Sequence, residues 1–467
     1  MGNFWFENDG KISVSHLYLK NWFKSMGYYR HYIDSKQWIM VKIKDRIIEE
    51  VELLAPKNEC LNYLLNLPED NEGYEIRIRA YEYLYLKSSH YFGKEFLETL
   101  DSTTDIKNFY IMRDTESHSF KFYKNCVLIL DKEGIKEIPY KRMYGYIWKT
   151  QVIDREWKKV NGVSVYEKFI DKISGDDKLK KQTFKSIIGY YLWTYKSPTF
   201  LPCITLTDEV LSNNACGRTG KGLFFTAIGK MLKMVKLDGK KFDFNYDFCF
   251  QLVSHDTQLV VIEDVERKFD FEKLFSILSE GMEINKKNKA SFFLGFDDSP
   301  RFGLTTNYAL RGNTDSYMAR IREVELKKYF SAEYTPEHEF NHKFFIQWTN
   351  EEWLLFDNFM IDCIMFFMNF GFVKSDNKYY QYKKLLNTLG EDVIELFDDL
   401  KRDQWYSKAD LKVKIKTVSD MKHIGTRKIK EYMDCYCDYH GLRVDEGRVS
   451  DVRSVKFVEK DSLLELS

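Results

Sequence analysis

Hydrophobic and polar positions in the first 200 residues show two periodicities, one typical of helices and one typical of strands. Residues 14–29 repeat apolar side chains at helical spacing, whereas residues 37–51 alternate like a strand. Residues 165–196 read as two helices separated near Gly175. We therefore predict an α+β N-terminal accessory domain over residues 1–150 and a helical collar over residues 151–199.

The next segment, residues 200–345, alternates short apolar runs with a helical pattern. The runs at 202–208, 257–265 and 301–307 are typical of buried strands, and residues 222–235 carry an apolar helical face. This alternation predicts an α/β core in which a parallel sheet is flanked by helices. The predicted helical face is formed by Leu223, Ala227, Ile228, Met231 and Val235.

The last segment, residues 346–467, begins with the most apolar stretch of the chain, at 353–372. Asp357 and Asp362 interrupt that stretch, which favours a buried helix over a membrane span, so we expect no membrane partner. Further on, Ser407 is a helix cap, a basic helix spans residues 425–442, and two strands follow. This order predicts a winged-helix-like C-terminal domain.

The basic start of that helix, at Thr426, Arg427, Lys428 and Lys430, leaves two interpretations open. It binds phosphates, or it packs against the preceding domain as a lid.

Composition narrows the class of protein. The 467 residues contain 71 Lys plus Arg and 71 Asp plus Glu, so any binding of nucleic acid must come from local patches. The first residues lack a basic start followed by an apolar run, and the eight cysteines lack zinc spacing. We expect a protein of the bacterial cytoplasm with reduced thiols.

A glycine-rich stretch, ACGRTGKG at 215–222, is similar to the phosphate-binding loop G-x-x-x-x-G-K-[ST]. Lys221 opens a helix, so loop N–H groups and the positive helix end would face phosphate oxygens while Lys221 reaches the β- and γ-phosphates. The predicted ATP-binding residues are Gly217, Arg218, Thr219, Gly220, Lys221, Gly222 and Leu223. The alternative is a glycine turn that caps a core helix.

Polar residues also end two predicted strands downstream. Glu263 and Asp264 follow the run at 257–262, and Asn307 follows the run at 301–306. Ligands of open α/β sheets bind at the carboxyl ends of the strands. One carboxylate would hold Mg²⁺ and the other would orient or deprotonate the attacking water, with Asn307 contacting that water or the γ-phosphate.

The order of these motifs resembles that of the superfamily III helicases of viruses, phages and plasmids, a branch of the AAA+ ATPases. The closer likeness is to phage and plasmid primase-helicase proteins. The matching segments are GRTGKG, VVIED, the hairpin candidate EINKKNKASFFLGF, GLTTN and SYMARIREVEL, together with residues 122–157 before the core.

The resemblance implies an AAA+ ATPase core and a homo-oligomeric ring, expected to be a hexamer, that hydrolyses ATP with Mg²⁺ and moves on single-stranded DNA. It implies that Arg320, or as second choice Arg322, is an arginine finger acting on the neighbouring subunit's ATP. It also implies that Lys286, Lys287 and Lys289 contact DNA in a central channel. Two alternatives remain if the resemblance in motif order is set aside. The lysines would then form a solvent-exposed turn, and Arg320 would pair with Glu323.

Two departures from the loop template are Ala215 at its first glycine and Gly222 in place of the hydroxyl that ligates Mg²⁺. Gly222 keeps a second function open: an ATP-binding replication initiator or DNA-binding assembly protein in which nucleotide is a structural switch. The first 150 residues lack a paired-carboxylate polymerase motif, so we expect a separate primase or polymerase.

Overall fold

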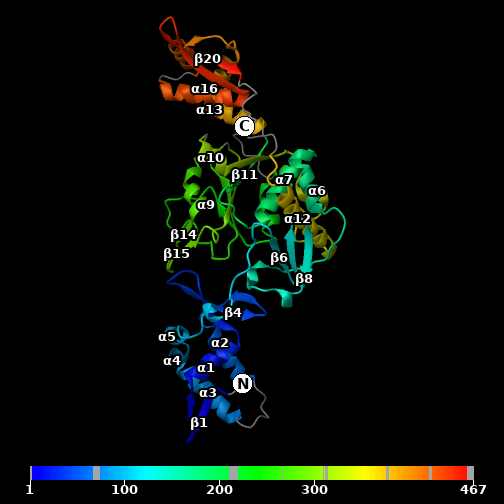
Figure 1. The fold of residues 1–467 in the computed structure, drawn as a ribbon, viewed down its shortest axis with the longest axis vertical. Coiled ribbons are helices and arrows are strands. Elements are labelled where there is room, and N and C mark those ends of the chain that lie inside the picture. Colours follow the sequence, from blue (N-terminus) through cyan, green and yellow to red (C-terminus); the bar gives the residue numbers. More distant parts are fainter. Residues whose placement is uncertain are drawn as a thin grey trace.

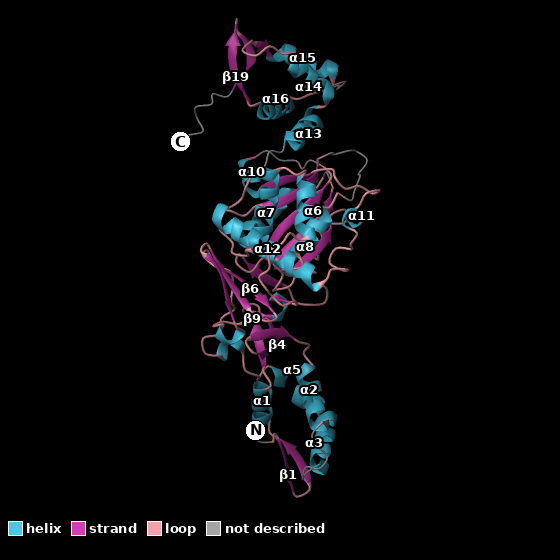
Figure 2. Cartoon of the chain, turned by 90° about the vertical axis from the view of Figure 1, so that its right-hand side faces the viewer, coloured by secondary structure: helices cyan, strands magenta, loops and turns pink. Residues whose placement is uncertain are grey.

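The computed structural model arranges the chain as three units that follow one another along its long axis (Figure 1). It describes residues 3–66, 74–209, 219–266, 268–308, 310, 314–374, 378–419 and 423–459. The N-terminal unit lies at one end, the C-terminal unit at the other, and the central unit holds the largest sheet (Figures 1 and 2).

The N-terminal unit combines small sheets with short helices. Its sheets have the strand orders β1-β2, β3-β4-β5-β9 and β10-β6-β7-β8. The strands are β1 Trp5–Asn8, β2 Lys11–Val14, β3 Tyr28–Tyr32, β4 Trp38–Lys44, β5 Ile47–Glu50, β6 Ser119–Tyr123, β7 Val127–Asp131, β8 Gly134–Ile138, β9 Ile147–Trp148 and β10 Val152–Ile153. The helices are α1 His16–Ser25, α2 Ala55–Leu65, α3 Tyr74–Leu86, α4 Ser88–Phe92 and α5 Lys94–Leu97.

The central unit is a parallel sheet in the order β12-β13-β16-β11-β17. Its strands are β11 Cys203–Asp208, β12 Met234–Asp238, β13 Leu259–Val265, β16 Arg301–Thr306 and β17 Ile321–Leu326. Strand β13 is apolar and buried from Leu259 to Ile262, and β11 and β16 are buried along their whole lengths, as expected for a parallel sheet that is covered on both faces. This confirms the predicted α/β core and its three predicted strands.

Helices cover the two faces of this sheet separately. One face packs on α6 Val165–Ser174, α7 Lys178–Leu192, α8 Lys221–Ile228 and α12 Asn350–Phe370. The other packs on α9 Phe275–Glu280, α10 Asp315–Arg320 and the hairpin of β14 Gly281–Ile284 and β15 Phe292–Gly295. As predicted, α6 and α7 are separated at Gly175, which ends α6 with a φ of 70°. The short α11 Pro336–Phe340 precedes α12.

The predicted helix 222–235 is wrong in its second half. Helix α8 ends at Ile228, and Val235 lies in β12 and pairs with Val260. A Cβ on Gly229 would lie 2.6 Å from the Met234 side chain, so the chain turns tightly there to return to the sheet. The apolar spacing continued past the real helix end because Met231 and Leu232 are also buried.

The apolar segment at 353–372 forms the buried helix that the sequence predicts. It is the one helix of the described residues that is long and apolar enough to span a bilayer, yet half of its apolar window is buried inside the protein. Asp357 in its middle is fully buried and accepts two hydrogen bonds from Arg155, of 3.0 Å from Nε and 2.6 Å from Nη2. The core therefore extends to Met368, and this ion pair adds to the apolar contacts that join the core to residues 123–157.

The C-terminal unit has a hydrophobic cluster of its own, drawn from residues 385–457. Its elements are α13 Lys378–Leu389, α14 Glu391–Asp398, β18 Tyr406–Ser407, α15 Lys408–Val418, α16 Thr426–His440, β19 Leu442–Val449 and β20 Val452–Glu459. The strands pair in the order β18-β20-β19. The predicted cap at Ser407, the basic helix, which runs from Thr426 to His440, and the final hairpin are confirmed.

The Arg155–Asp357 pair should contribute strongly to the stability of the junction between the core and residues 123–157, beside the apolar contacts there. We expect Asp357→Asn to lower the free energy of unfolding by about 3–5 kcal/mol, because it leaves a largely buried guanidinium without its counter-charge. The matched control is Asp362→Asn on the same helix, whose pair with Lys159 is about half exposed and should change stability by less than about 0.5 kcal/mol. Urea unfolding followed by tryptophan fluorescence measures both, and equal effects would contradict this assignment.

Candidate functional site

The polar residues that end β11 and β16 meet the start of α8 at the carboxyl edge of the sheet. β11 and β16 are neighbours, but the helix after β11 covers one face of the sheet and the helix after β16 covers the other. Such a switch point opens a crevice at the strand ends, which is where open α/β sheets bind ligands.

Lys221 occupies this crevice. Its ammonium group donates to Asp208 Oδ2 at 2.6 Å and to Asn307 Oδ1 at 2.5 Å. The side chains of Lys221 and Asp208 are only 8% and 7% exposed, so this is a buried ion pair. Thr219 Oγ1 donates to the other carboxylate oxygen of Asp208. The ammonium group thus connects the end of β11, the start of α8 and the end of β16.

Gly220 makes the turn that places Lys221 at the first position of α8. It has a φ of 110°, which glycine adopts readily and other residues rarely do. A Cβ at this position would also lie 2.8 Å from the ring of Phe169. The loop therefore needs glycine at 220 for its conformation and for its close approach to α6.

Glu263 lies beside the first turn of α8. A Cβ built on Gly222 would be 3.5 Å from Glu263 Oε1, an ordinary contact distance. The same oxygen accepts a 2.7 Å hydrogen bond from Lys236 Nζ, which also donates to Thr226 Oγ1 at 3.0 Å. Glu263 is thus next to the Lys221 helix, and its charge is balanced by Lys236.

Asp264 is placed differently from Glu263, although the two are adjacent in sequence. The register of β13 against β16 shifts between Ile262 and Val265, and Asp264 has a φ of 56° within this bulge. Its backbone N–H donates to Thr305 Oγ1 at 2.8 Å and its side chain is exposed. Because of the bulge, Glu263 lies beside α8 and Asp264 does not.

The donor set suits a magnesium ion that is mostly held by phosphates and water. No group of three or more His, Cys, Asp or Glu residues that could hold a metal occurs among the described residues. Mg²⁺ commonly takes one or two carboxylates, several waters and substrate phosphates. Glu263 fits that pattern, and Gly222 contributes no side-chain oxygen.

The remaining loop residues divide into two groups. Gly217 and Arg218 lie outside the described residues. Leu223 is partly buried and packs against the core cluster of α6, α7 and α12. Asp208 is the residue that the sequence analysis missed, although its position at the end of the strand before the loop was a usable signal.

Arg320 and Arg322 lie at the opposite edge of the sheet. Ile321 pairs with Cys203 at the start of β11, whereas Leu326 pairs with Asp208 at its end. At about 3.3 Å per residue these positions are roughly 16 Å apart along the strand. Arg320 lies over the ring of Phe275, with its guanidinium carbon 5.0 Å from the ring centre, and Arg322 donates to backbone carbonyls. Neither arginine reaches Lys221 of its own chain.

The predicted DNA-binding lysines lie on the turn between β14 and β15, which confirms the hairpin but places its tip against the N-terminal unit. Gln37 donates to the carbonyl of Ser291, and burial together with the nearby charge of Lys289 lowers the pKa of Lys286. Lys287 and Lys289 are exposed.

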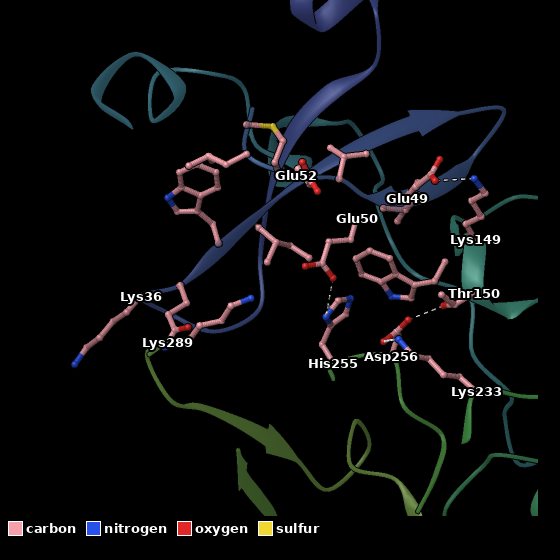
Figure 3. A pocket seen from close by; sticks show the side chains of 18 of the residues that line it. Lys36, Glu49, Glu50, Glu52, Lys149, Thr150, Lys233, His255, Asp256 and Lys289 are labelled. Atoms are coloured by element: carbon pink, nitrogen blue, oxygen red, sulfur yellow. Dashed lines mark hydrogen bonds and ion pairs between the residues drawn. The ribbon is translucent and has the colours of Figure 1, made fainter. Parts of the chain in front are cut away.

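A cavity of about 1000 Å³ separates the hairpin and the core loops from β4 and β5 (Figure 3). Lys289 lines it beside Lys36 (Figure 3). At its wall, His255 Nδ1 lies 3.9 Å from Glu50 Oε2. Five lysines and five carboxylates line it, so its charge is balanced.

Comparison with known proteins adds little to this geometry. No protein-family model matches the chain, and no curated protein matches it. Among solved structures, apo structures of the C-terminal region of NrS-1 align over 95% of this chain and 99% of theirs, with 11–12% identity and TM-scores of 0.43–0.44. A likeness at this level assigns no activity, so the function of the site must be inferred from its own residues.

Two glycines of the loop should respond in opposite ways to the same substitution. We expect Gly220→Ala to destabilise the protein by about 1–3 kcal/mol, because its φ is left-handed and Phe169 blocks the added methyl group. Gly222→Ala should be neutral or stabilising by up to about 1 kcal/mol, because its Cβ fits and alanine favours the helix. Thermal unfolding of both variants tests this, and a loss of stability in Gly222→Ala would contradict the described packing around α8.

Proposed function

We propose that the chain is an ATP-driven motor of the superfamily III helicase type, which assembles as a ring, a hexamer by family resemblance, and moves on single-stranded DNA during replication of a phage or mobile element. The observation that carries the proposal is the buried ammonium of Lys221, held between Asp208 and Asn307 at the carboxyl ends of two neighbouring strands. A lysine in this position is suited to contact the oxygens of a bound triphosphate.

Each residue of the site has a role in this proposal. Lys221 exchanges its contact with Asp208 for the β- and γ-phosphates, and loop N–H groups hold the same phosphates. Glu263 holds the metal water shell or orients the attacking water, while Asn307 contacts the γ-phosphate or that water. Asp264 is a second carboxylate that could hold the metal water shell or orient the attacking water. It would do so after a rearrangement of the bulge in β13. Mg²⁺, when bound, neutralises charge on the phosphates.

The position of Arg320 supports the proposed ring. Its distance from Lys221 along the sheet means that it can serve as an arginine finger only for the ATP of a neighbouring subunit. Such arginines increase phosphoryl-transfer rates by about 10³–10⁵. We assign the role to Arg320 ahead of Arg322, because Arg322 donates to two carbonyls, those of Met318 and Ile321, whereas Arg320 donates one longer bond of 3.3 Å to the carbonyl of Ser316.

DNA contact is assigned to the hairpin lysines, of which Lys287 and Lys289 are exposed. Their grip would be electrostatic and should weaken as salt rises. Primers would come from a separate primase or polymerase.

Gly222 is the observation that favours the second candidate, an initiator or assembly protein in which ATP is a structural switch. The absence of a side-chain oxygen there would weaken metal binding and slow hydrolysis without preventing nucleotide from ordering an oligomer.

Steady-state ATP hydrolysis with and without single-stranded DNA separates the two functions. We expect turnover that DNA stimulates, and its loss in Lys221→Ala, because the ammonium is the one cation of the described residues placed between the two strand ends. ATP binding without turnover in the wild-type chain would exclude the motor and leave the switch.

Subunit sharing is tested by mixing two inactive variants. We expect Arg320→Ala chains and Lys221→Ala chains to regain part of their hydrolysis when mixed, since some interfaces would then combine an intact loop with an intact arginine. Arg322→Ala serves as the comparison for the choice of arginine. If mixing restores nothing while both variants still assemble, the role given to Arg320 is wrong.

A further inference from the structure

The hairpin of β19 and β20 carries two arginines without any partner in the described chain. Arg448 and Arg453 are directly opposite each other in the antiparallel register, and both are exposed. Among the described residues, the side chain of neither arginine makes an ion pair or a hydrogen bond. Like charges at opposite positions of a strand pair are destabilising, so this arrangement weakens the hairpin in the isolated protein.

The other cations of the same hairpin behave differently. Arg443 and Lys456 both pair with Asp445, at 3.4 Å and 3.8 Å. At the neighbouring position, Glu446 accepts a hydrogen bond of 2.7 Å from Lys408 at the start of α15. Ion pairs therefore cover the base of the hairpin and stop before its tip, where two arginines outnumber one exposed carboxylate, that of Asp451.

The tip also exposes two apolar side chains beside its turn and projects from the unit. Val449 and Val452 form its last pair and are 41% and 46% exposed. Ser450 and Asp451 close it with φ values of 49° and 63°, the signs of a type I′ turn. The last buried side chain toward the tip is Ser454, so the rungs beyond it have no core to pack on. The hairpin reaches the far end of the molecule (Figure 2).

The base of the hairpin is fixed against the unit. A Cβ on Gly447 would lie 2.8 Å from the Trp405 ring, so the strand passes directly over that indole. Lys456 Nζ lies 5.4 Å from the centre of the same ring. The tip is thus a short arm on a rigid support.

Helix α16 is poorly suited to lie along a DNA groove. Its exposed first turn offers Arg427 and Lys430, but its outer face continues with Glu431, Asp434 and Asp438. Lys428 is paired with Glu431 at 2.9 Å. Phosphates would be repelled along most of this helix, so only its first turn could approach DNA.

We propose that the tip of the β19–β20 hairpin binds duplex DNA by placing Arg448 and Arg453 in the minor groove. The guanidinium groups meet the negative potential of the groove, and the two valines contact the sugars beside them. The potential is strongest where the groove is narrow, as in A-tracts, so the tip should prefer such sequences. The first turn of α16 adds phosphate contacts. This interaction is separate from the single-strand contact assigned to the β14–β15 hairpin, and it requires no nucleotide.

The test measures binding of the full chain to labelled duplexes by fluorescence anisotropy, without ATP and over a range of salt. We expect Arg448→Gln/Arg453→Gln to lose about tenfold or more in duplex affinity, to reduce the slope of log K against log salt by about 2, and to lose the preference for an A-tract over a G·C duplex. The matched control, Arg443→Gln/Lys456→Gln, removes the same charge from the paired base of the hairpin and should stay within about threefold of wild type.

Each other outcome would overturn the proposal. An equal loss in the control would show a general charge effect, and an equal loss for single-stranded DNA would show that the duplex is not the ligand. Failure of the wild-type chain to bind duplex at low salt would assign the arginines to another partner, such as an acidic protein segment. The tip residues are exposed, so melting curves should show that both variants are folded. Lys221→Ala should retain duplex binding, so failure of this proposal and of the proposed ATPase are distinguishable.

Discussion

The central sheet depends on neutralising one buried ammonium group. Lys221 brings a positive charge to the carboxyl edge, where water is largely excluded, and the charge is tolerated only because Asp208 and Asn307 meet it there. That requirement fixes the ends of β11 and β16 relative to the start of α8. In the proposed function, a bound triphosphate would replace Asp208 as the partner of the ammonium.

The two edges of the sheet have different chemistry. Lys221 and Glu263 lie at the carboxyl edge, whereas Arg320 lies at the amino edge and the β14–β15 hairpin reaches from the core to the N-terminal unit. A rigid parallel sheet between them is a suitable element for coupling a nucleotide at one edge to a nucleic-acid contact at the other. The cavity between the N-terminal unit and the core has a balanced charge, so its lining as a whole does not form a positive surface.

Much of this could be predicted from the sequence, because buried strands and their polar ends leave clear local patterns. The three strands ending near Asp208, Glu263 and Asn307 were predicted correctly, and so was the buried helix around Asp357. Three features were not accessible. The end of α8 was hidden by apolar residues that belong to the turn and to β12, the bulge that separates Glu263 from Asp264 depends on pairing with β16, and the partnership of Asp208 with Lys221 is a tertiary contact.

The most direct test of the central claim is a structure of the chain with Mg²⁺ and a non-hydrolysable ATP analogue. We expect the triphosphate at the carboxyl edge, Lys221 Nζ within hydrogen-bond distance of the β- and γ-phosphate oxygens and no longer paired with Asp208, and Glu263 next to the metal water shell. A nucleotide bound elsewhere, with the Lys221–Asp208 pair intact, would contradict the account.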